Sequence, residues 1–248
     1  MKQLLAALSS ESLKLKRTLA LWMVFIAPFI VILLQFFILY DRAKFFAGRD
    51  VWGVLMYAVT SIWAIFMLPL FITLETALLG SLEHSGQSWK HLFAQPIPRW
   101  SVYTAKLLTV MGMILISTVV LVLGELGAGK LLSILRPELR FHESPDFTMM
   151  VRMATMVYLA SWILLAFHTW VSMRWKSFAL AAGVGVAGTF FAVFASGAGI
   201  GKFYPWLFPV NAVSTSPERM KLAILLGIIG GVIIAVMGCW NVVRRDVE

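Results

Sequence analysis

Charged residues and cysteine are scarce in this chain of 248 residues. Asp, Glu, Lys and Arg make up 13% of the sequence, whereas a soluble domain carries about 25%. This shortfall argues against a soluble globular domain and indicates that lipid is the solvent. The single cysteine, Cys239, excludes a framework of internal disulfide bonds.

Long stretches without any charged residue are abundant by contrast. They cover residues 18–40, 51–74, 107–124, 153–173, 177–201 and 222–243. About 20 apolar residues, rising 1.5 Å each, cross a hydrocarbon core of about 30 Å. Each stretch therefore predicts a spanning helix, and we extend the third back to residue 103. The expected fold is an all-α membrane protein with six transmembrane helices in a single domain.

The distribution of Lys and Arg bears on orientation. An even number of spans puts both termini on one side, and the basic residues before the first span outnumber those just after it. This favours cytoplasmic termini by the positive-inside rule. Segment 75–106 would then be cytoplasmic, and segments 125–147 and 202–219 would be external loops. The net charge of +9 is interpreted as anchoring to anionic membrane lipids rather than binding to nucleic acid.

The first 17 residues suit a helix that lies in the membrane interface. Lys2, Glu11 and Lys14 would point largely away from its apolar face. That face would hold Leu4, Leu5, Leu8 and Leu15. The alternative is a plain basic flank. Within the first two spans, Pro28 and Pro69 predict local kinks.

Motifs for catalysis, cofactors and metals are incomplete. The "SGAGIGKF" of residues 196–203 lacks the first glycine and the Ser or Thr of a phosphate-binding P-loop, so we expect no ATP hydrolysis by this chain. All four histidines precede Ser196, which is against the Ser-then-His order of a rhomboid-type intramembrane protease. "FHESPDF" carries Asp146 where the zinc motif H-E-x-x-H needs its second histidine. We expect no catalytic, cofactor or metal site.

Three features of the span interiors bear on function and packing. The charge-free windows indicate that energy for any transport arrives from outside the membrane. His168, in the fourth span, is either functional or bonded to a neighbouring helix, and we favour the second. Small residues at Gly227 and Gly231, and in a row at 181, 185 and 189, allow close helix packing within one chain or between two copies.

A polar insert at residues 75–106 separates the second and third spans. Trp89, Leu92 and Phe93 are spaced i, i+3 and i+4, which predicts a short amphipathic helix over residues 88–95. Gly86 marks a turn before that helix, and Pro96 stops it. Such a helix either covers lipid or is gripped by a soluble partner.

The insert also resembles a known family. "EHSGQSWKHLFAQPIPRW" followed by "YTAKLL" resembles the cytoplasmic segment after the second span of ABC type-2 permeases, in particular the branch with lantibiotic-immunity and bacitracin-export subunits. The N-terminal "SSESLKLKRTLALW" and the "YPWLFP" at 204–209 support this. The alternatives are an intramembrane enzyme and a six-helix channel-like protein without an ATPase.

The resemblance implies a permease of the bacterial plasma membrane that exports a hydrophobic or peptide substrate, as in lantibiotic immunity. Its partners would be a cytoplasmic ABC ATPase subunit, which binds the ATP, and a second copy of the chain or a paralogous permease. A coupling segment of about residues 75–102, which makes up most of the insert, would contact the ATPase. The coupling residues would be Glu83, Trp89, Lys90, Leu92, Phe93, Pro96 and Arg99.

Overall fold

The described part of the chain is built from helices. The computed structural model describes residues 2–16, 18–85, 98–139, 141 and 144–244. The α-helices are α1 (Lys2–Leu15), α2 (Leu19–Asp41), α3 (Ala43–Phe46), α4 (Val51–Ile62), α5 (Leu68–Ser85), α7 (Arg99–Leu135), α8 (Phe147–Ala160), α9 (Trp162–Arg174), α10 (Phe178–Ala195), α11 (Phe208–Asn211) and α12 (Pro217–Arg244). Within these residues no strand occurs, so the all-α prediction is confirmed.

In the described part of the chain, five helical stretches are long and apolar enough to cross a membrane: α2, α4 together with α5, α7, α10 and α12. Helices α8 and α9 make a sixth if they are counted as one span, bent by 40° between Ala160 and Trp162. Large apolar side chains cover the outside of the bundle, among them Trp22 at 65% exposed and Phe194 at 81%. This surface suits lipid, and the chain is a multi-pass membrane protein.

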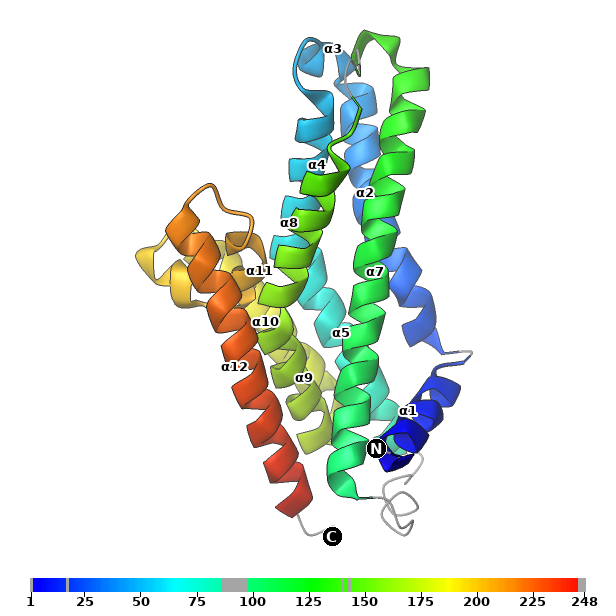
Figure 1. Cartoon of the computed structure of the whole chain (residues 1–248), viewed down its shortest axis with the longest axis vertical. Coiled ribbons are helices and arrows are strands. Elements are labelled where there is room, and N and C mark those ends of the chain that lie inside the picture. The colour runs from blue at the N-terminus through cyan, green and yellow to red at the C-terminus, as the bar shows by residue number, and fades with distance from the viewer. Residues whose placement is uncertain (1, 17, 86–97, 140, 142–143, 245–248) are drawn as a thin grey trace.

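The two termini lie at the same end of the bundle, which we call the terminal end (Figure 1). Helix α1, the last turns of α5, α9 and α12 and the first turn of α7 lie there as well. The opposite end carries α3 and the end of α7. Both termini on one side agrees with an even number of passes. The cytoplasmic placement of that side stays a prediction.

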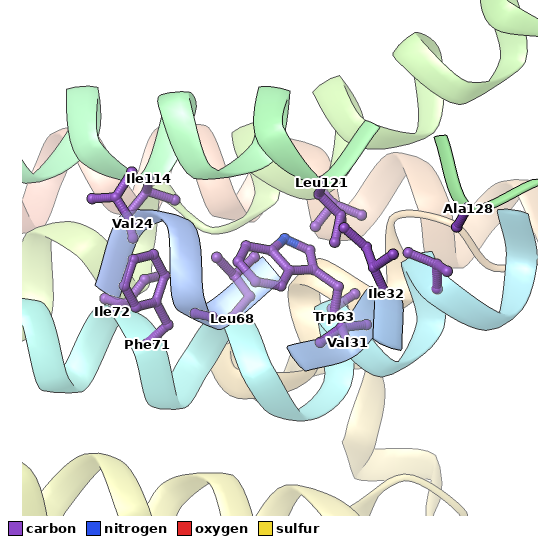
Figure 2. Packing of buried hydrophobic residues seen from close by; sticks show 14 of the residues in the cluster. Val24, Val31, Ile32, Trp63, Leu68, Phe71, Ile72, Ile114, Leu121 and Ala128 are labelled. Carbon is purple, nitrogen blue, oxygen red and sulfur yellow. The ribbon is translucent and has the colours of Figure 1, made fainter. Parts of the chain in front are cut away.

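The core lies where α2, the α4–α5 stretch and α7 meet. Figure 2 shows Val24 of α2, Ile72 of α5 and Ile114 of α7 packed together, with Trp63 further along the same seam. All of these side chains are at most 1% exposed. The three helices therefore form one unit, against which α8 to α12 are arranged.

Helix α7 is longer than the sequence predicted. We expected the third span to end near residue 124 and an external loop to follow, but the helix continues to Leu135. Glu125 does not end it, because that side chain is buried at 2% exposure. Gly129 then lets Trp52 of α4 lie directly against the α7 backbone, where a Cβ would clash with the indole ring. The loop prediction for residues 125–135 was wrong.

Neither proline ends its helix. At Pro69, the helix takes one π-helical turn over Trp63–Met67, and the Leu68 amide bonds to the Trp63 carbonyl. Proline cannot donate the usual helical hydrogen bond, and irregular turns of this kind are found where helices bend. Helix α2 runs unbroken through Pro28, which leaves the carbonyl of Val24 without its usual helical donor. The hydroxyl of Ser117 on α7 donates to that carbonyl at 2.9 Å.

We expect Ser117→Ala to lower the free energy of unfolding by about 1–3 kcal/mol, because a buried carbonyl would lose its donor. Ser133→Ala on the same helix is the matched control, since the Ser133 hydroxyl is exposed and bonds to Lys130 of its own helix. Thermal unfolding of the detergent-purified protein measures both. Equal midpoints for the two variants would contradict this role of Ser117.

The small residues of the last two spans pack within the chain. A Cβ at Gly227 would lie 2.6 Å from the Cα and carbonyl oxygen of Ala160, and one at Gly231 would lie 2.8 Å from the Trp162 carbonyl carbon. Helix α12 thus packs on the bend between α8 and α9. A Cβ at Gly185 of α10 would clash with the side chain of Thr73 on α5. The sequence left open whether these small residues pack within one chain or between two copies. In this structure, both motifs make contacts within one chain.

Candidate functional site

The first turns of α7, directly after the polar insert, are held by a buried ion pair. Lys106 of α7 donates to Glu11 of α1 at 2.8 Å, and their side chains are 2% and 4% exposed. Lys14 approaches the other oxygen of the Glu11 carboxylate, also at 2.8 Å. Ala7 and Leu15, one helical turn to each side of Glu11, are buried with it. Helix α1 is therefore fixed to α7 by charge and by packing.

This arrangement corrects the predicted orientation of α1. We expected Glu11 to lie largely away from the apolar face, yet it is buried at the centre of the contact with α7. Leu5, which we placed on the apolar face, is 61% exposed. The periodicity of α1 could not show this, because the residue that makes Glu11 an interior group is 95 positions away.

The Glu11 carboxyl gives the α1 contact a defined pH dependence. Burial alone would raise the pKa of this group, but Lys106 and Lys14 outweigh burial and hold the pKa below its ordinary value. A pKa lower in the folded than in the unfolded state stabilises above the unfolded value, about 4.3 for Glu. That stabilisation is lost as the pH falls through the folded pKa.

We therefore expect α1 to detach on acidification below about pH 4 and to stay docked between pH 5 and 8. Hydrogen exchange of the α1 amides, relative to their intrinsic rates at each pH, measures the change. Glu11→Gln should exchange rapidly in α1 at neutral pH and show no further step on acidification. A wild-type α1 with constant protection down to pH 3 would contradict this explanation.

On its other side, α7 contacts α9 and α12. The ring of Tyr103 is buried against Met173 of α9 and Cys239 of α12, and Gly238 leaves no room for a Cβ beside the Tyr103 hydroxyl. Arg99, the first residue of α7, donates to the backbone carbonyl of Val243 near the end of α12 at 3.3 Å. The first two turns of α7 are thus connected both to α1 and to α12.

The structure places two of the seven predicted coupling residues. Arg99 begins α7, and Glu83 belongs to the last turn of α5, although its side chain is not among those described. The predicted helix 88–95 lies outside the described residues. So do five of the coupling residues, namely Trp89, Lys90, Leu92, Phe93 and Pro96. The ends of the helices that flank this segment both lie at the terminal end (Figure 1).

Two buried carboxyl groups were missed in the sequence. Glu75 of α5 is 0% exposed and Glu125 of α7 is 2% exposed. Among the described residues, neither Glu75 oxygen nor Oε1 of Glu125 has a hydrogen-bond partner. Each lies one residue outside a charge-free window, yet about 15 Å inside its helix end at 1.5 Å per residue. The helices continue past the charge-free windows, so our expectation that the span interiors are entirely apolar was wrong. Buried ionisable groups inside membrane-spanning helices are candidates for a functional role, and both carboxyl groups fall in this class.

For His168, the structure agrees with the alternative that we favoured, a contact with a neighbouring helix. Its ring is 1% exposed and stacks edge-on to Phe167 and Trp206. Nε2 lies 3.5 Å from Oγ1 of Thr73 on α5. The histidine therefore joins α9 to a neighbouring helix.

Comparison with known proteins agrees with this architecture. A family model described as ABC-2 family transporter protein matches residues 7–195, from α1 to the end of α10. This chain belongs to that family. As an ABC-2 transporter it is the membrane permease of a transport system, and the family implies a cytoplasmic ABC ATPase as partner. The comparison does not select the lantibiotic-immunity branch, and no curated protein matches the chain significantly.

Proposed function

We propose that this ABC-2 permease is the membrane-spanning subunit of an ATP-driven exporter in the bacterial plasma membrane. A separate cytoplasmic subunit binds and hydrolyses the ATP and contacts the segment between α5 and α7. The observation that carries the proposal is the match of residues 7–195 to the ABC-2 transporter family. The buried Glu11–Lys106 pair adds that the helix after the insert is firmly attached to α1.

The coupling route follows from these contacts. Residues 86–97 connect α5 to α7, so a force on them acts on the first turn of α7. Lys106 passes that force to α1, and Arg99 together with Tyr103 passes it to α12 and α9. Closure of an ATPase pair would thus tilt several spans together. In this proposal Glu83, Trp89, Lys90, Leu92, Phe93, Pro96 and Arg99 form or support the ATPase contact.

The transported substrate in this proposal is a hydrophobic molecule or a peptide, and antimicrobial-peptide immunity is the specific hypothesis. The resemblance of the insert to lantibiotic-immunity and bacitracin-export subunits motivates it. The functional unit would pair this permease with a second copy or with a paralogous permease. Export of a labelled lantibiotic from vesicles that contain both subunits would test this hypothesis.

The coupling assignment is tested by Phe93→Asp in the full chain. We expect this variant to insert into the membrane normally and to lose co-purification with the ATPase subunit, because a carboxylate replaces an apolar contact. Phe203→Asp, at an exposed aromatic residue beyond the far end of α10, is the matched control and should co-purify as wild type does.

The two parts of the proposal fail in different ways. If Phe93→Asp retains the ATPase, the coupling assignment is wrong even if transport is confirmed. If the wild-type chain co-purifies with no ATPase from its own cells, the proposed function is wrong.

A further inference from the structure

An apolar groove opens on the outside of the bundle between α9 and α12, near the terminal end. Its volume is about 350 Å³, within the range of about 300–1,000 Å³ typical of ligand sites. Its walls are formed by Phe167, Trp170, Ile234, Met237, Trp240 and Asn241. Two polar groups of the wall are paired with each other, since the Trp170 indole nitrogen donates to the amide oxygen of Asn241 at 3.3 Å. The groove thus offers an apolar surface to its occupant.

The groove opens sideways, toward lipid. Met237 and Trp240 on its α12 wall are 62% and 57% exposed. On α12 the lining runs from Ile234 to Asn241, a rise of about 10 Å, which fits within one leaflet of about 15 Å. Because α12 ends at Arg244, the mouth of the groove faces the end of a membrane-crossing helix, where lipid headgroups are expected.

Each wall of the groove ends in an arginine stacked on a tryptophan. The Arg244 guanidinium lies 4.2 Å from the centre of the Trp240 ring. Arg174 lies 5.7 Å from the centre of the Trp175 ring, and that ring contacts Trp170 at 5.6 Å between centroids. Two cations thus flank the mouth of an apolar groove, one from α9 and one from α12.

We propose that this groove is a binding site for an anionic phospholipid. One acyl chain lies along Ile234 and Met237, and the phosphate lies between Arg174 and Arg244. Basic pockets between transmembrane helices bind anionic headgroups in this way, and Trp–Arg pairs are favoured at headgroup depth. An apolar groove alone would equally suit a helix of a second copy, but two cations at headgroup depth match a charged lipid.

The test uses the purified full chain in a neutral detergent, with phosphatidylglycerol and phosphatidylcholine of identical acyl chains as probes. We expect phosphatidylglycerol to be retained in native mass spectra and to raise the thermal midpoint, and phosphatidylcholine to be retained at least tenfold less. Arg174→Gln/Arg244→Gln should lose this preference. Arg219→Gln, an exposed arginine at the other end of α12, is the charge control and should keep it.

A second pair of variants tests the groove itself. Ile234→Trp fills it and should abolish retention of phosphatidylglycerol, whereas Leu225→Trp, at a 55% exposed position of α12 away from the groove, should not. Inorganic phosphate alone should leave the midpoint unchanged. The arginine variants lie at helix ends and give an answer even if Ile234→Trp does not fold.

Several results would overturn the proposal. These are equal retention of the two lipids by wild type, a preference that survives in the double arginine variant, and a stabilisation by phosphate alone equal to that by the lipid. A change from dimer to monomer in Ile234→Trp with lipid retention intact would assign the groove to a second copy of the chain instead.

Discussion

Lys106→Met is expected to release α1 from the bundle and to lower the free energy of unfolding by about 3–5 kcal/mol. The substitution removes the charge at 2.8 Å from a Glu11 carboxylate that is 4% exposed, and breaking one side of a buried ion pair costs about this much. Lys14 remains beside Glu11, but its own side chain is 30% exposed, so it compensates only in part. Thermal unfolding and proteolysis of α1 measure the loss.

Two control variants separate charge from packing. Glu11→Met/Lys106→Met removes both charges and should recover most of the stability, since apolar replacements of a buried pair are often neutral or stabilising. Lys130→Met changes an exposed lysine of the same helix and should have little effect. If Lys106→Met unfolds at the wild-type temperature, α1 is not held by this pair.

Gly227→Leu is expected to separate α12 from the α8–α9 bend and to destabilise the protein by about 3 kcal/mol or more. A Cβ at this position would lie 2.6 Å from backbone atoms of Ala160, and backbone cannot move aside as a flexible side chain can. The same bend sets the direction of α9, which holds His168 and forms one wall of the apolar groove. Loss of this contact should therefore also impair transport. Thermal unfolding and size-exclusion profiles measure the effect.

Gly112→Leu is the matched control for a glycine inside a membrane-spanning helix. Nothing lies within 4 Å of a Cβ built at Gly112 of α7, and leucine is a better helix former than glycine by about 0.8 kcal/mol. We expect Gly112→Leu to be as stable as wild type or more so. Equal losses in the two leucine variants would show that glycine matters for the helix itself rather than for the contact with Ala160.

Much of the fold follows from the distribution of charge along the sequence. Among the described residues, each candidate membrane span overlaps one of the charge-free windows, and Leu19–Asp41 differs from the predicted 18–40 by one residue at each end. The prediction failed where a charge was taken as the end of a span. Glu125 is buried inside α7, which continues another ten residues to Leu135. A window count cannot distinguish a charge at headgroup depth from one that faces protein.

The site was less predictable, for a physical reason. The position of the polar insert is a local property of the sequence, and α5 and α7 flank it as expected. The pairing of Glu11 with Lys106 is a tertiary contact over 95 residues, and helical periodicity contains no information about it. The same holds for the bond from Ser117 to the Val24 carbonyl. Pro28 predicted only a local kink, although a proline in a helix also leaves one carbonyl without its helical donor.

The buried carboxyl groups revise one view of energy coupling. Apolar windows suggested that the span interiors take no part in it, whereas Glu75 and Glu125 lie deep inside two helices of the core unit. We expect Glu75→Gln, which keeps the size and removes the titratable carboxyl group, to fold normally and to reduce transport in vesicles without loss of ATPase binding. Unchanged transport would limit Glu75 to a structural role.

The central claim is that the terminal end is the surface that meets the ATPase. Its most direct test is photo-crosslinking in intact cells from position 88, within the predicted coupling helix, and from Phe203, beyond the far end of α10. We predict that a probe at position 88 captures a soluble P-loop ATPase and that a probe at 203 captures none. Capture from position 203, or from neither position, would contradict the claim.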